Sequence, residues 1–388
     1  MPDQVILLVL AGLRRRNLDA MPHLRALLAP GDEAVLAPSF PCLGGPVQAN
    51  LLTGVTADRH GVVADSRFDR SRRTIERNSA FLSHLEQPPI GEILRQRDPQ
   101  LASSIIGFES HVGWGAAPRA SLLEAAIEAV RYCPAFLYLY LSDLADVAQH
   151  WGPESDELQL ALADADGMLG ELIAKVAETY GSPAPLWLVT GCFTVSPVEN
   201  VFLPNRVLYE AGWLELRDGE DGPVADLKRS RAFALVDRQI SHVFVADEQP
   251  STIAQVAKLF RSRTEIDETL VGEERRRFDL EHRNSGDVIL ISAPDSWQAY
   301  PWWSDSGEAP AWARRTDAAH KLGADPLELF ASDGQVPLDF TLIRGSHGAP
   351  ARDERQRSII FSSEPGVIAG GLLADTDVCD LVLRQFGI

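Results

Sequence analysis

Residues 5–12 read VILLVLAG, six consecutive apolar residues followed by Ala11 and Gly12. A continuous apolar run that closes on a glycine predicts a strand buried on both faces of a sheet, with a tight turn at its exit. The run does not match a secretory signal peptide, because Asp3 precedes it and Arg14–Arg16 follow it. It is also too short to span a bilayer. We therefore expect a buried strand here.

Apolar runs of the same kind recur along the chain and are separated by helix-like segments. Further runs lie at Leu101–Ile106, Ala135–Leu141, Leu186–Thr190, Phe233–Leu235, Asp287–Ser292, Phe340–Ile343 and Ser358–Ser362. Amphipathic stretches with near-helical spacing lie at Met21–Leu28, Ser121–Arg131 and Ser155–Tyr180. This alternation predicts an α/β fold, a doubly wound and mostly parallel sheet with helices on both faces.

One internal segment departs from this alternation. Residues 196–337 contain an acidic loop, Asp218–Asp221, and an aromatic cluster within Trp297–Trp303. We expect this segment to form a smaller inserted cap, between a first part of the core (1–195) and the return of the chain to the core (338–388). The aromatic cluster could stack on a planar substrate or form a satellite core under the cap.

Composition and charge exclude several classes of partner. The 388 residues are 45% hydrophobic and carry a net charge of −19, which repels phosphate backbones and anionic lipid alike. We therefore expect neither nucleic acid nor a membrane surface as a partner. The four cysteines are scattered, with no Cys-x-x-Cys pair, so we expect no disulfide framework or zinc knuckle and a cytoplasmic location.

Several motifs carry a resemblance to a known family. In chain order they are Phe40–Pro46, Leu51–Gly54, Arg59–Val62, Tyr140–Leu144, Trp151–Ser155, Val189–Gly191 and Gly345–Gly348. Over almost its whole length the chain resembles the nucleotide pyrophosphatase/phosphodiesterase family of the alkaline phosphatase superfamily. The resemblance implies an alkaline phosphatase-like fold. It also implies phosphoryl transfer at two zinc ions, which activate a Thr or Ser alkoxide.

The side chains that this chemistry needs are missing at the matching positions. The nucleophile position falls on Gly44, and the phosphate-binding amide position falls on Asp65, whose charge opposes an anion unless it is protonated or paired with an arginine such as Arg67. Of the expected metal ligands only His347 is retained, while the others fall on Ala11, Ala145, Gln149, Gly191 and Cys192. We therefore expect no metal cofactor.

Four side chains leave alternatives open. Asp146 and His150 stand four residues apart on one helix face, so a local shift of register would let them bind one zinc or similar ion together with His347. Otherwise Asp146 flanks the helix and His150 lies at its surface. His347 could act as a general base or be held by backbone in its turn. Cys192 could be a thiol nucleophile or a small buried side chain.

These observations support three functional hypotheses. The first is a catalytically degenerate protein, or pseudoenzyme, kept as a binding, scaffolding or regulatory subunit with a protein partner, such as an active paralogue or a pathway enzyme. It could also hold a small-molecule ligand in the cleft. The second is a repurposed enzyme that uses His347, His150, Asp146 and Cys192 for metal-independent acid/base chemistry or with a single metal. The third is residual hydrolysis of phosphate esters.

Overall fold

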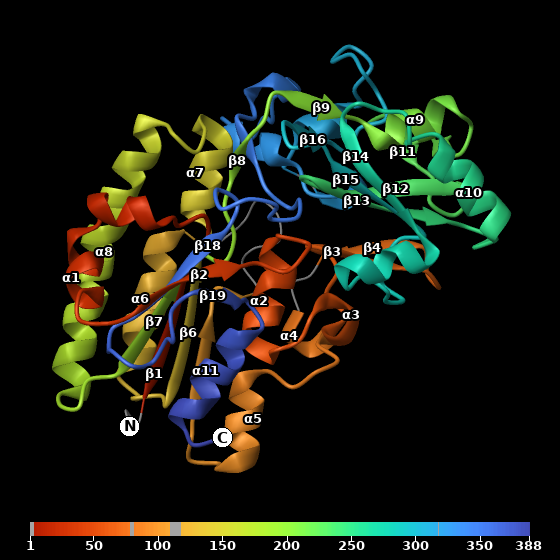
Figure 1. Ribbon diagram of the computed structural model, residues 1–388. Coiled ribbons are helices and arrows are strands. Elements are labelled where there is room, and N and C mark those ends of the chain that lie inside the picture. Colours follow the sequence, from red (N-terminus) through yellow and green to blue (C-terminus); the bar gives the residue numbers. More distant parts are fainter. Residues whose placement is uncertain (1–3, 78–80, 109–117, 317) are drawn as a thin grey trace.

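The computed structural model describes residues 4–77, 81–108, 118–316 and 318–388 (Figure 1). Its core is a seven-stranded sheet in the order β19-β2-β18-β7-β1-β6-β5. In that order the strands span Leu372–Ala374, Glu33–Ala37, Ser358–Ser362, Leu186–Thr190, Val5–Leu10, Phe136–Leu141 and Ser103–Ile106. β18 runs antiparallel to both of its neighbours, and the other pairs are parallel. The predicted doubly wound, mostly parallel sheet is confirmed.

Helices cover both faces of this sheet, so its central strands are buried at every position and almost entirely apolar (Figure 1). One layer contains α1 (Pro22–Leu28), α6 (Arg119–Val130), α7 (Asp143–Trp151) and α8 (Asp156–Tyr180). The other contains α2 (Gly44–Thr53), α3 (Ala57–His60), α4 (Phe81–His84), α5 (Ile90–Arg97) and α11 (Asp377–Gln385). The long helix α8 begins at Ser155, whose hydroxyl accepts the N–H of Leu158 at 3.2 Å.

A second, antiparallel sheet lies beside the core in the order β12-β13-β15-β14. Its strands span Ala232–Asp237, Ile240–Val245, Val288–Ser292 and Ile266–Val271, and helices α9 (Pro204–Glu210) and α10 (Pro250–Lys258) accompany them. Tyr300, Trp302 and Trp303 are buried in the hydrophobic core of this sheet. These aromatic residues therefore pack as a core.

Several short strands lie outside the two sheets, and one pair of them marks where the chain passes from one sheet to the other. β8 (Ser196–Pro197) pairs with β17 (Gly345–Ser346), so the chain leaves the core and returns to it at adjacent points. The hairpin of β3 (Ser66–Asp69) and β4 (Thr74–Arg77) packs against the second sheet through Phe68. The remaining short strands are β9 (Asn200–Phe202), β16 (Ser296–Gln298), β10 (Leu216–Arg217) and β11 (Val224–Ala225). The limits of the cap at residues 196 and 337 stay a prediction.

One predicted strand is wrong. Within Phe340–Ile343, residues Phe340–Leu342 form a short 3-10 helix instead. The carboxylate of Asp339 accepts the backbone N–H of Thr341 at 2.9 Å, which stabilises a helical turn at this point. Across the described ranges, no helix is both long and apolar enough to cross a membrane.

Candidate functional site

Small residues at three chain turns meet beyond the carboxyl end of β1. The N–H of Gly12 lies 3.1 Å from the carbonyl oxygen of Gly191, which joins the exits of β1 and β7. A Cβ placed on Gly12 would lie 3.4 Å from the Cα of Ala145 in α7. The structure thus brings together Ala11, Ala145 and Gly191, three of the positions singled out from the sequence. Their side chains are methyl groups or hydrogen, so none can bind a metal.

The space at Gly191 is closed by backbone. A Cβ placed there would overlap the carbonyl oxygen of Leu13 and would lie 2.5 Å from the hydroxyl of Ser358. A carboxylate at this position would therefore require the loop after β1 to move. The local packing at Gly191 therefore leaves no room for an acidic side chain.

Arg238 occupies the neighbourhood of these residues. It lies in the turn between β12 and β13, with φ of 57°, and its side chain is only 10% exposed. Its Nε donates to Gln149 Oε1 at 3.1 Å, and its Nη1 donates to Asp65 Oδ2 at 3.1 Å and to Asp237 Oδ1 at 2.7 Å. The guanidinium therefore donates hydrogen bonds to Gln149 and Asp65. The resemblance implies a metal ligand at the first of these positions and a phosphate-binding amide at the second.

Asp65 supplies a negative charge to the same place. Its Oδ1 accepts the N–H of Gly45 at 2.7 Å, in the first turn of α2, and its own N–H donates to Asp237 Oδ2 at 2.9 Å. A helix N-terminus of this kind is where a bound anion would accept backbone N–H groups. The carboxylate of Asp65 already does so. Arg67, named from the sequence as its partner, instead lies 3.4 Å from Glu76.

Burial shifts the pKa values of these charged groups. It raises the pKa of Asp65 to about 7, with a further increase from the charge of Asp237, against the opposing effect of Arg238. It also raises the pKa of Asp146 to about 6, and Arg238 again opposes the shift. Burial alone would lower the pKa of Arg238, but the surrounding carboxylates raise it above its ordinary value. The guanidinium is therefore charged at every working pH.

The sequence profile of the type I phosphodiesterase / nucleotide pyrophosphatase family matches residues 5–84 and 84–321. The chain belongs to this family. No curated protein sequence matches it.

The phosphodiesterase fold is also shared with solved structures. Human ectonucleotide pyrophosphatase/phosphodiesterase 5 is 16% identical with a TM-score of 0.70, and the murine protein is 15% identical with a TM-score of 0.69. An inactive variant of the murine protein in complex with AMP is 15% identical, with a TM-score of 0.68. Each match covers 99% of this chain and 95% of the other. At this level of identity the likeness concerns the fold alone.

The two zinc ions implied by the phosphodiesterase resemblance do not fit the residues present. The expected ligand positions in α7 hold the methyl group of Ala145 and the amide of Gln149, and that amide accepts a hydrogen bond from a guanidinium. Among the residues that the structure describes, no group of three or more His, Cys, Asp or Glu side chains could hold a metal ion. The nucleophile position, Gly44, is the first residue of α2 and has no side chain.

His347, the retained ligand type, is buried in this phosphodiesterase-like core. Its Nδ1 lies 2.8 Å from the carbonyl oxygen of Cys42, and its ring stacks on Phe193 with centroids 4.1 Å apart. A carbonyl partner assigns the proton to Nδ1. Burial, and then the charge of Arg238, lowers the pKa of His347 well below its ordinary value. The imidazole of His347 is therefore neutral. The backbone carbonyl of His347 accepts the N–H of Gln239, the residue that follows Arg238 in the turn.

Cys192 is completely buried in the hydrophobic core of the main sheet. Burial raises the pKa of its thiol well above the ordinary value, and it raises the pKa of the Cys42 thiol as well. Both sulfurs are therefore protonated at neutral pH, whereas a nucleophilic cysteine needs a thiolate.

Asp146 and His150 differ in surroundings although they share α7. The carboxylate of Asp146 faces Ser142 and Gln149 at 3.4 and 3.5 Å. The imidazole of His150 stacks on Trp151 and on Phe330, with centroids 4.4 and 3.7 Å apart. Asp146 thus belongs to the network around Arg238, and His150 belongs to an aromatic contact. A single metal shared by Asp146, His150 and His347 stays a prediction. The contacts of Asp146 with Ser142 and Gln149, and those of His150 with Trp151 and Phe330, do not support it.

Asp237 and Arg238, the two residues that organise this site, do not stand out in the amino-acid sequence. Both lie at the tip of a hairpin between two apolar runs, and such a pattern indicates a turn without indicating where the turn points. A non-glycine residue at positive φ is uncommon and marks a position that its surroundings constrain. The positive φ of Arg238 is such a mark, but it is visible only in the folded backbone and not in the sequence.

Proposed function

We propose that this phosphodiesterase family member is catalytically degenerate and acts as a binding, scaffolding or regulatory subunit. One observation carries the proposal. The ion pair of Arg238 with Asp65 lies among the positions at which related chemistry would need metal ligands and a phosphate. A side-chain cation and a side-chain carboxylate there satisfy each other, without metal or substrate.

Electrostatics supports this proposal. Two unit charges about 4 Å apart interact by about 4 kcal/mol at an effective dielectric constant of about 20. The Arg238 guanidinium would therefore repel a divalent ion next to it by about 8 kcal/mol, and the neighbouring carboxylates of Asp65 and Asp237 are already paired with that guanidinium.

The repurposed enzyme receives less support. That hypothesis needs His347 within hydrogen-bond reach of another titratable group, and its ring instead bonds the backbone carbonyl of Cys42. The raised pKa values of Asp65 and Asp146 are typical of acid/base groups in active sites, but buried ion-pair networks produce the same shifts. We also keep a protein partner and a cytoplasmic location as parts of the proposal. The four cysteines, which are all unpaired, fit a reducing compartment.

The first experiment measures zinc in protein purified without chelator, by elemental mass spectrometry, together with hydrolysis of bis(4-nitrophenyl) phosphate with and without added zinc. We expect less than about 0.1 zinc per chain and no turnover above the buffer rate. The Arg238→Gln variant serves as a comparison. It removes the positive charge that opposes a metal ion but supplies no metal ligand, so it too should remain inactive. Near one zinc per chain with turnover in the unmodified protein would overturn the proposal.

A further inference from the structure

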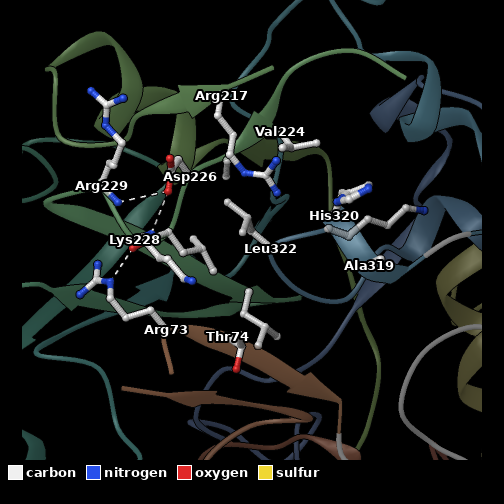
Figure 2. A pocket seen from close by; sticks show the side chains of 14 residues that line it. Arg73, Thr74, Arg217, Val224, Asp226, Lys228, Arg229, Ala319, His320 and Leu322 are labelled. Carbon is white, nitrogen blue, oxygen red and sulfur yellow. Dashed lines mark hydrogen bonds between the residues drawn. The ribbon is translucent and has the colours of Figure 1, made fainter. Parts of the chain in front are cut away.

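A second site lies in the part of the molecule that holds the antiparallel sheet. A cavity of about 720 Å³ opens between the β3–β4 turn, the β10–β11 hairpin, the loop 226–229 and the segment 319–322 (Figure 2). This volume is in the range of small-molecule pockets. Its walls include none of the positions described above around Arg238. The cavity is therefore a separate feature of the fold.

Basic side chains gather around this cavity in a chain that is otherwise acidic. Arg73, Arg217 and Lys228 line it, although the chain carries a net charge of −19. Figure 2 shows the side chains of Arg217 and Lys228 reaching over the open space. Within the described part of the chain, none of these three cations has a carboxylate at ion-pair distance. This sets them apart from Arg229, whose Nε lies 3.0 Å from Glu215 Oε2.

Asp226, the acidic residue in the lining, makes no ion pair with Arg73, Arg217 or Lys228. The carboxylate of Asp226 accepts the backbone N–H groups of Lys228 and Arg229 at 3.1 and 3.2 Å, which uses it to hold the turn (Figure 2). Arg73 is fixed by two carbonyl oxygens, those of Leu227 at 2.5 Å and Ser230 at 2.9 Å. Lys321, a further cation in the lining, is buried and already paired with Asp325 and Glu328. Among the described cations of the lining, Arg73, Arg217 and Lys228 lack a negative partner of this kind.

Apolar side chains form the remaining wall. Ile75, Val224, Leu227 and Leu322 line the cavity, and the ring of His320 packs on Trp312 at its edge. A site with apolar walls and a few convergent charges binds ligands that combine the two properties. The charged head would lie near the cations and the body against the apolar wall.

We propose that this cavity binds an organic anion with a compact, doubly charged head and an apolar or aromatic body. Arg217 and Lys228 bind the head, whether it is a phosphate or a pair of carboxylates, and Val224 and Leu322 contact the body. The inference goes beyond the proposed function and is independent of the residues around Arg238. It gives the chain a ligand site whether or not the family chemistry has been lost.

Isothermal titration calorimetry of the full chain tests this inference with phenyl phosphate, phenylsuccinate and the neutral benzyl alcohol. We expect one site per chain for at least one of the two anions, weaker by about tenfold at high salt, because charge attraction is screened. The two anions distinguish a phosphate head from a dicarboxylate head. Benzyl alcohol should bind at least about tenfold more weakly than the better anion.

A matched pair of variants separates the site from general charge attraction. Arg217→Gln and Arg229→Gln each remove one positive charge from the same surface, but only Arg217 lacks a carboxylate partner. We expect Arg217→Gln to weaken binding about tenfold and Arg229→Gln to change it by less than about twofold. Circular dichroism on both variants checks that they remain folded. Equal losses in the two variants, equal binding of benzyl alcohol, or no binding of either anion at about 1 mM would overturn the inference.

Discussion

Arg238 Nη1 lies 3.1 Å from Asp65 Oδ2, and both side chains are almost completely buried. The pair joins the tip of the β12–β13 hairpin to the loop that precedes β3, so it ties the antiparallel sheet to the core. A buried charge without its partner is strongly unfavourable, so removing either side chain of this pair should destabilise the folded state. The arrangement therefore has consequences for stability as well as for chemistry.

Arg238→Gln should destabilise the protein by about 3 kcal/mol, because it leaves the carboxylates of Asp65 and Asp237 buried without their cation. Urea unfolding followed by circular dichroism measures the change. The control is Arg276→Gln, which removes an exposed ion pair with Glu281 and should change stability by less than about 0.5 kcal/mol. Similar small changes in both variants would show that the buried pair contributes little.

Asp65→Asn should change how stability depends on pH. The folded-state pKa of Asp65 is raised from its ordinary value of 3.8 to about 7, so the folded state binds the proton more tightly between these values. The contribution of this group to stability therefore falls as pH rises from about 4 to about 7. Unfolding free energies across that window should show the variant gaining relative to the unmodified protein as pH rises. A constant difference between the two would contradict the assigned shift.

Gly191→Ala should destabilise the protein by more than about 2 kcal/mol, because its Cβ would overlap the carbonyl oxygen of Leu13. Gly167 provides the matched control. It lies exposed in α8, and a Cβ there would meet no atom within 4 Å. Gly167→Ala should therefore stabilise the helix by about 0.5–1 kcal/mol. Thermal unfolding of the two variants gives the comparison, and a tolerated alanine at 191 would show that the loop after β1 can move.

Thiol labelling should distinguish Cys133 from the other cysteines. Cys133 is exposed, whereas Cys42, Cys192 and Cys379 are buried with the pKa of each thiol raised by burial. Ellman's reagent at pH 8 should therefore label one thiol per native chain quickly and all four in guanidinium chloride. The Cys133→Ser variant should lose the fast phase. A second fast thiol assigned to Cys192 would restore it as a nucleophile candidate.

The strands of the core were predictable because burial on both faces leaves a continuous apolar run. The runs Val5–Leu10, Leu186–Thr190 and Ser358–Ser362 match β1, β7 and β18 at every residue. The run Phe340–Ile343 has the same composition but forms a 3-10 helix. A strand needs a neighbouring strand to bond with, and four apolar residues do not say whether one is available.

The location of the candidate site was predictable, but the side chains that organise it were not. The motifs located Gly44, Gly191 and His347 at turns that the structure brings near one another, since the exits of parallel strands meet at one edge of a sheet. They did not indicate that a hairpin more than forty residues beyond Gly191 would place Arg238 among them. Long-range contacts of this kind depend on how two sheets pack, and local patterns carry no information about that packing.

The amino-acid sequence by itself determined the family and the α/β core, because those properties follow from local patterns and from residue types at motif positions. Tertiary structure alone decided which side chains meet at the candidate site. The carboxylate of Asp65 at the start of α2 and the guanidinium of Arg238 beside it are brought together by the docking of one sheet on another. The cations of Arg217 and Lys228 likewise acquire a shared cavity only in the folded chain, because charge without position defines no binding site.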